Sequence, residues 1–133
     1  MTSSVLLPEG WPRPSGFAHG IAARGRLVFV AGQVGWNPVT CLIESGDFVE
    51  QTRAALQNLV TVLRAGGAGP EHVVRLTWFV TDVFRYTSGR QAIGGTFREL
   101  FHGHYPAMSV VQVAGLFEPG ALVEIEATAV VPD

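Results

Sequence analysis

The sequence predicts an α+β fold, in which a β-sheet carries two helices on one of its faces. A helix with an apolar stripe is expected between Asp47 and Gly66, where apolar residues recur at helical spacing. Runs rich in β-branched and aromatic residues lie on both sides of it in the chain and are typical of strands. The last run, residues 122–130, alternates between apolar and polar residues, which indicates a strand with one buried face. The expected element order is ββαβαββ.

The first half of the chain is expected to supply two strands and the longer helix. Residues 1–15 contain three prolines and are expected to form an extended, irregular N-terminal segment. Residues 17–23 and 27–32 are expected to form the two strands of a hairpin. The helix begins at Asp47, because Glu50 three residues later completes the pattern of a capping box.

The second half is expected to supply the other helix and three strands. Residues 73–81 predict a central strand, and residues 109–113 and 122–130 predict the last two. A second helix is expected over about residues 88–102, although Gly94 and Gly95 each weaken it by roughly 1 kcal/mol relative to alanine. With both helices on one face, the other, partly apolar face of the sheet needs a cover. A second copy of the chain is the simplest one.

Composition narrows the class of protein. The chain of 133 residues is expected to form a single domain, residues 1–133, and its 47% apolar content favours an oligomer. The formal net charge is −2 without a basic stripe, so we expect no nucleic-acid partner. All nine cationic residues are arginine, which excludes Schiff-base chemistry on a lysine.

Cys41 is the only cysteine, which excludes intramolecular disulfides and thiolate zinc cages and fits a reducing compartment. No signal peptide is apparent at the N-terminus, and the apolar runs are shorter than the roughly 18 residues that a membrane span requires. We therefore expect a soluble, cytoplasmic protein without a membrane partner.

Five segments in register, spanning residues 14–130, give the chain a resemblance to a known family. They are PSGFAHG, LVFVAGQVGW, QTRAALQNLVTVLRAGGAGPEHVVRLTWFVTD, YPAMSVVQVAGL and LVEIEATAV. The chain resembles the Rid (YjgF-like) family of reactive-intermediate enamine and imine deaminases. The resemblance implies a chorismate-mutase-like fold and a homotrimer, whose sheets form a central barrel and whose subunits enclose small-molecule clefts between them.

The resemblance also implies a chemistry. Active members hydrolyse enamines and imines such as 2-aminoacrylate to a keto acid and ammonia, and we expect neither a cofactor nor a metal here. In such members an arginine after a Pro-Ala pair binds the substrate carboxylate, and the first glutamate of the EIEA motif positions water or relays a proton. The glycine of the GQ motif offers backbone contacts, and a tyrosine before the first strand adds a hydroxyl.

Two of these four positions match and two depart. Glu124 is the candidate catalytic residue, or else a strand carboxylate paired with an arginine across the trimer, and Gly32 is a candidate substrate-binding residue. Met108 stands where the arginine would be and Phe17 where the tyrosine would be, and both are expected to bind substrate as the apolar lining of the cleft. A guanidinium holds a carboxylate bidentately, and each hydrogen bond to a charged group is worth about 1.5–3 kcal/mol. The chain is therefore expected to be an arginine-less, divergent member that does not act efficiently on amino-acid-derived imines.

Other residues are candidates with competing structural interpretations. His19 beside Phe17 and Trp36 after the GQ motif are candidate cleft residues, or else a hydrogen-bonded structural histidine and a loop tryptophan that covers the core. Arg75 could replace the missing arginine or be a solvated side chain. A metal site at His102 and His104 lacks an obvious third ligand.

We expect Arg90 and Arg98 on the second helix to be surface charges, and Glu126 to be structural. The sequence leaves three functions open: a hydrolase of neutral or aromatic imines or enamines, a non-catalytic metabolite-binding trimer and, less favoured by the negative charge, a ribonuclease.

Overall fold

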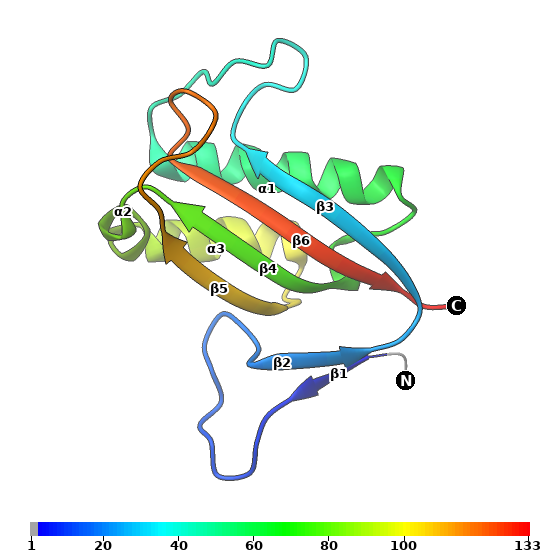
Figure 1. The fold of residues 1–133 in the computed structure, drawn as a ribbon. Helices are drawn as coiled ribbons and strands as arrows, with labels where there is room; N and C mark the ends of the chain where they lie inside the picture. Colours follow the sequence, from blue (N-terminus) through cyan, green and yellow to red (C-terminus); the bar gives the residue numbers. More distant parts are fainter. Residues whose placement is uncertain (1–2) are drawn as a thin grey trace.

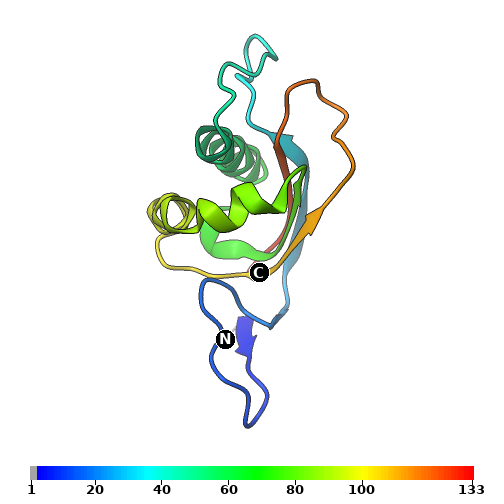
Figure 2. The same cartoon turned by 90° about the vertical axis from the view of Figure 1, so that its left-hand side faces the viewer.

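Helices cover only one face of the main sheet, and the other face is open (Figures 1 and 2). The computed structural model describes residues 3–133. The strand order of the main sheet is β3–β6–β4–β5, with β4 and β5 parallel and the other pairs antiparallel. Its strands are β3 (Arg26–Val34), β4 (Val73–Val80), β5 (Ala107–Gln112) and β6 (Val123–Val131). The predicted α+β class is confirmed.

The longer helix, α1 (Phe48–Ala65), has the limits that the sequence predicts. Asp47 is its N-cap, and the Asp47 side chain accepts a hydrogen bond from the backbone N–H of Glu50 at 2.9 Å. Gly66 closes the helix, and Gly67 follows with a left-handed φ of 74°. The buried side of α1 packs against the sheet through residues that include Ala55, Leu56, Leu59, Val60 and Leu63.

The predicted hairpin between residues 17–23 and 27–32 is wrong. Strand β2 (Gly20–Ala23) pairs with β1 (Ser3–Leu6), whereas β3 pairs with β6 (Figure 1). Strand β1 lies within the segment that was expected to be irregular, and it ends before the first proline, so its N–H groups are free to join a ladder. At Gly25 the backbone adopts a φ of 146°, which redirects the chain from the small sheet into the main one.

The predicted second helix, about residues 88–102, corresponds to α3 (Arg90–Phe101), and a short helix that was not predicted precedes it. Helix α2 (Val83–Ser88) comes first, with Asp82 as its N-cap, and Gly89 separates it from α3 (Arg90–Phe101). The Asp82 carboxylate accepts from the backbone N–H of Phe84 at 2.9 Å, a capping signal that places a helix start before residue 88. A single-turn 3₁₀ helix, η1 (Pro70–His72), leads into β4.

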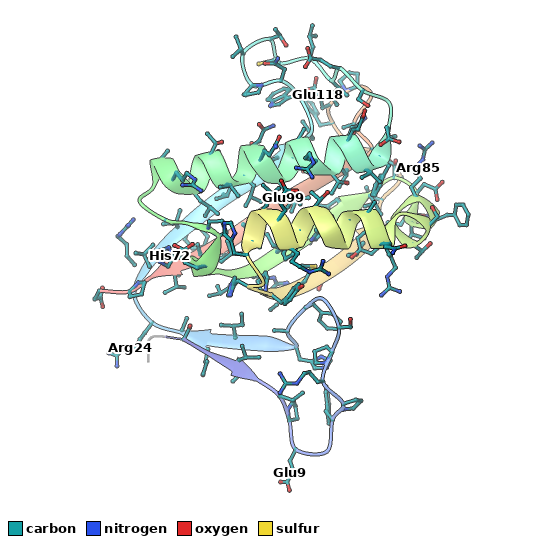
Figure 3. The ribbon with its side chains drawn as sticks, turned by 180° about the vertical axis from the view of Figure 1, so that it is seen from behind. Glu9, Arg24, His72, Arg85, Glu99 and Glu118 are labelled. Carbon is teal, nitrogen blue, oxygen red and sulfur yellow. The ribbon has the colours of Figure 1, made fainter. Side chains whose placement is uncertain are left out.

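Helices α1 and α3 lie side by side across the sheet (Figure 3). Glu99 of α3, labelled in Figure 3, forms an ion pair of 2.9 Å with Arg53 of α1. A hydrogen bond from Arg53 lowers the pKa of the Glu99 carboxyl below its usual value. Because both side chains are exposed, this pair contributes little to stability compared with the apolar core beneath it. Over residues 3–133, no helix is long and apolar enough to cross a membrane.

A buried amide ties α1 to the start of β6. Gln51 is 1% exposed, and its Nε2 donates to the carbonyls of Ser45 and Gly120 at 2.9 and 3.0 Å. Its Oε1 accepts from the backbone N–H of Leu122 at 2.8 Å. These three hydrogen bonds fix the loop before α1 and the turn before β6, so Gln51 holds the backbone that leads into Glu124.

We predict that Gln51→Leu destabilises the protein by about 2–4 kcal/mol, because it leaves three backbone groups without their partner in a buried site. The free energy of unfolding, measured by urea denaturation at one protein concentration, checks this. Gln57→Leu on the exposed side of the same helix is the matched control and is expected to change stability by less than about 0.5 kcal/mol. Equal effects of the two variants would contradict the structural role of Gln51.

Candidate functional site

The candidate site residues form two groups on opposite faces of the main sheet. Met108 pairs in register with the buried Leu76 and packs against the core beneath the helices. Glu124 pairs with Phe79, which follows the buried Trp78 on β4 and therefore lies on the open face. Within one chain, Met108 and Glu124 therefore cannot line the same cavity.

On the open face, the backbone of Gly32 lies against the carboxylate of Glu124. A Cβ atom built on Gly32 would stand 2.6 Å from the carboxyl carbon of Glu124 and closer still to Oε2. Glycine alone allows this approach, which brings the carboxylate beside the irregularity in the pairing of β3 with β6 between Val30 and Gln33. Within residues 3–133, the Glu124 side chain forms no hydrogen bond or ion pair.

The surroundings of Glu124 mix charged and apolar side chains. Alternation along β4 and β6 puts Arg75 and Glu126 on the same open face as Glu124. On β3, Leu27 and Phe29 are 57% and 72% exposed. Exposed aromatic and aliphatic side chains next to charged ones are typical of a surface that contacts another protein chain.

On the helical side, Phe17 and Met108 line a cavity of about 460 Å³ between β5 and α3. Its walls combine aromatic and apolar side chains with polar ones, among them two arginines, and carry no carboxylate. They comprise Ser15, Gly16, Phe17, Trp78, Tyr86, Thr87, Arg90, Ile93, Gly94, Phe97, Arg98, Tyr105, Met108 and Val110. A cavity of this size and lining can hold a small organic molecule.

Arg90 and Arg98 are exposed, as expected for surface charges, and both also lie in the wall of the Met108 cavity. Tyr86 lies in the same wall. Burial raises the pKa of the Tyr86 hydroxyl above its usual value, and the charge of Arg90 partly offsets that rise. The spacing of Arg90, Gly94 and Arg98 at intervals of four places them on one helix face, but the sequence does not show that this face borders a cavity.

His19 lies beside Phe17, with the two rings edge to face at a centroid distance of 5.4 Å, and Trp11 contacts its ring as well. His19 lines a second cavity, of about 670 Å³, which lies between the N-terminal segment (residues 5–19) and the loop of residues 103–105. This second cavity shares Phe17 and Tyr105 with the Met108 cavity, so His19 is adjacent to that cavity but is not part of its wall.

Trp36 lies apart from both groups. It lines a third cavity, beside α1, and its backbone carbonyl accepts a hydrogen bond from the Asn58 side chain at 2.9 Å. Asn58 also donates to the carbonyl of Val34 at 3.1 Å. The loop after β3 is therefore attached to α1, and within one chain Trp36 contributes to neither the Met108 cavity nor the Glu124 face.

The two histidines of the HxH pattern do not converge. Nε2 of His104 is 2.6 Å from the backbone carbonyl of Val73, whereas His102 caps α3 with a left-handed φ of 53° and is exposed. In the described part of the chain, no cluster of three His, Cys, Asp or Glu side chains could hold a metal ion. The geometry of His104 indicates a structural role.

Comparison with known proteins places the chain among small proteins of similar fold. The family model described as Endoribonuclease L-PSP matches residues 13–131. A 2-iminobutanoate/2-iminopropanoate deaminase of Mus musculus is 34% identical over 105 residues, which cover 79% of this chain and 74% of the deaminase.

Two crystal structures are also similar. YyfB of Yersinia pestis, a Rid-family protein of unknown function, matches with a TM-score of 0.85 and 38% identity, covering 98% of this chain and 100% of YyfB. TdcF of E. coli with bound serine matches with a TM-score of 0.72 and 29% identity, covering 96% of this chain and 98% of TdcF.

We predict that Gly32→Ala moves the Glu124 carboxylate while costing little stability, because the atoms that the new methyl group would overlap belong to the end of a flexible side chain. The carboxyl ¹³C resonance of Glu124 checks this, with Glu124→Gln to assign it. Gly115→Ala, where the added methyl group meets nothing within 4 Å, is the control and is expected to leave the resonance in place. An unchanged Glu124 resonance in Gly32→Ala would contradict the close approach.

Proposed function

The chain belongs to the Endoribonuclease L-PSP family, which includes Rid (YjgF-like) proteins, and on this premise we propose that it hydrolyses imines or enamines in clefts between subunits. The observation that carries the proposal is the Glu124 carboxylate, which lies beside the Gly32 backbone and has no partner within residues 3–133. A carboxylate without a partner is free to accept a proton from water. The similarity to a deaminase supports a carbon–nitrogen bond as the target.

Glu124 acts as the general base and then as the general acid. The Glu124 carboxylate takes a proton from a water molecule as the water oxygen bonds to the imine carbon, and it passes this proton to the imine nitrogen, which gives a carbinolamine. The carboxylate then takes the proton of the carbinolamine hydroxyl and delivers it to the nitrogen as the carbon–nitrogen bond breaks, so that the carbonyl forms and ammonia leaves. An enamine substrate is first protonated at carbon to give the imine. The net reaction consumes one water and yields a carbonyl compound and ammonia.

The substrate differs from the small imino acids on which active deaminases of the family act. Met108 offers an apolar, polarisable surface and no charge, and Phe17 offers a ring without a hydroxyl. A carboxylate bonded directly to the imine carbon would therefore have no cation at position 108, and leaving it unpaired costs several kcal/mol, on the order of its lost hydrogen bonds. Apolar or aromatic imines fit this lining.

The catalytic cleft takes residues from two chains. Glu124 and the Met108 cavity lie on opposite faces of the sheet, so only a neighbouring copy can bring them together. The open face, with Leu27 and Phe29 exposed, is the surface on which that copy packs. A cyclic homotrimer, in which the open face of each subunit packs against the β5 edge of the next, satisfies both requirements.

A non-catalytic, metabolite-binding trimer is the second candidate. It is favoured by the Met108 cavity itself, whose walls carry no carboxylate and no histidine to act as a base. In that case Glu124 only hydrogen-bonds the ligand. Ribonuclease activity, suggested by the description of the family model, is disfavoured by the net charge of −2, which provides no attraction for a phosphate backbone.

We predict that the protein releases ammonia from freshly generated uncharged and aromatic imines, and that Glu124→Gln lowers the rate by about 10²–10⁴-fold, the usual contribution of a general acid–base group. Glu126→Gln, on the same face and strand, is the matched control and keeps the activity. Coupled detection of ammonia measures both variants.

The same panel, extended to imines that carry a carboxylate directly on the imine carbon, separates the candidates. If Met108→Arg acts on these imines and the unmodified protein does not, position 108 is supported as the position that binds the carboxylate. If no imine yields ammonia, and the two glutamate variants release no less than the unmodified protein, the hydrolase is refuted and the binding trimer remains.

We also predict a trimer in solution, with three times the 14.2 kDa mass of the chain by light scattering. Phe29→Glu introduces repelling charges on the open face and is expected to yield monomers. Phe117→Glu is the control, because Phe117 is 99% exposed in the loop between β5 and β6, outside the sheet. A monomeric unmodified protein would rule out any cleft formed by two chains.

A further inference from the structure

We propose that Arg90 and Arg98 bind the anionic end of an apolar or aromatic ligand in the Met108 cavity. The ligand class is an aromatic carboxylate, or an equivalent anion, whose charged group is separated from its apolar body. This inference deepens the proposed function, because the cavity is the one that Met108 lines. Both arginines are exposed, as expected of surface charges, and both also line this cavity.

The first argument is geometric. Arg90, Gly94 and Arg98 follow one another at intervals of four residues along α3, so they share one face of the helix, and all three line the cavity. A Cβ atom on Gly94 would meet nothing within 4 Å, which means that open space lies between the two arginines. Two guanidinium groups on either side of a gap can hold one planar anion between them.

The second argument is electrostatic. Arg53 and Arg85 form ion pairs with Glu99 and Asp82, but within residues 3–133 neither Arg90 nor Arg98 has an acidic partner. The cavity wall holds these two cations and no Asp or Glu. Arg90 lies close enough to Tyr86, in the same wall, for its charge to lower the pKa of the Tyr86 hydroxyl against the larger effect of burial. A bound anion would supply the charge that the wall lacks.

The third argument concerns an unsatisfied donor. Trp78, another residue of the wall, is 1% exposed, and its indole N–H has no hydrogen-bond partner in the described structure. A buried donor without an acceptor is rare, because leaving it unsatisfied costs free energy. An oxygen of a ligand that enters the cavity would give this N–H an acceptor. Trp78 thus provides a second polar contact, apart from the arginines.

The remaining wall defines the body of the ligand. Phe17, Tyr86, Phe97 and Tyr105 surround the cavity with aromatic rings, which favour an aromatic or similarly flat apolar group. Met108 leaves the carboxylate position of the imino acid deaminases without a cation. The anion is therefore held by α3, at a distance from the reacting carbon, instead of next to it.

Binding of 3-phenylpropionate, compared with its neutral analogue 3-phenylpropanamide, tests the proposal on the full chain in its native assembly. Calorimetry gives the affinity, and the indole ¹⁵N–H resonance of Trp78, assigned with Trp78→Phe, reports occupancy of the cavity. We expect the acid to bind more tightly than the amide and to shift this resonance. The double variant Arg90→Gln/Arg98→Gln is expected to bind the acid about tenfold or more weakly and to bind the amide with unchanged affinity.

Arg64→Gln on α1 is the matched control, since Arg64 is a helical arginine outside the cavity. Equal affinities of acid and amide, no binding of either, or an unchanged acid affinity in the double variant would each overturn the proposal. The same titration in Glu124→Gln separates it from the proposed catalysis. If the protein binds the acid but hydrolyses no imine, only the proposed hydrolase is refuted. If it hydrolyses imines but binds acid and amide equally, only the proposed arginine site is refuted.

Discussion

A sheet that carries helices on only one face must leave its other face to water or to another molecule. Here the covered face contains the core, from Leu56 and Leu59 on α1 to Trp78 on β4. The open face combines exposed apolar side chains with the carboxylate of Glu124. Burial of apolar area is the main favourable term in protein association, so this asymmetry connects assembly and function. Only a neighbouring chain can both cover the face and complete a cleft around Glu124.

The position of Glu124 depends on contacts made far from it in the sequence. Gln51 holds the turn before β6, and β6 lies between β3 and β4, so the strand that carries Glu124 is fixed on both edges. Gly32 then allows the backbone of β3 to approach the carboxylate. A carboxylate fixed in this way, but without a cationic partner among residues 3–133, can interact with a ligand or a neighbouring subunit instead.

In the proposed ligand complex, the positive charge does not come from the position that binds the carboxylate in the active deaminases this chain resembles. Position 108 contributes apolar surface, and the charge comes from α3 through Arg90 and Arg98. Moving the charge away from the reacting centre changes the shape of the ligand that can be bound, because an anion and a reactive carbon then lie further apart. The two proposals together describe a family scaffold adapted to larger, more apolar ligands.

The sequence alone determined the features that depend on residues close together in the chain, namely the limits of α1 and the faces of β6. The Asp47 cap and the glycines after α1 fix that helix locally, and the alternation along β6 shows that Glu124 and Glu126 share a face because side chains in a strand have a period of two. Which strands pair is a long-range choice. Only the tertiary structure showed that β2 pairs with β1 instead of β3, that Met108 and Glu124 lie on opposite faces, and that Arg90 and Arg98 face a cavity. Packing between distant segments decides these relations, and no local pattern encodes it.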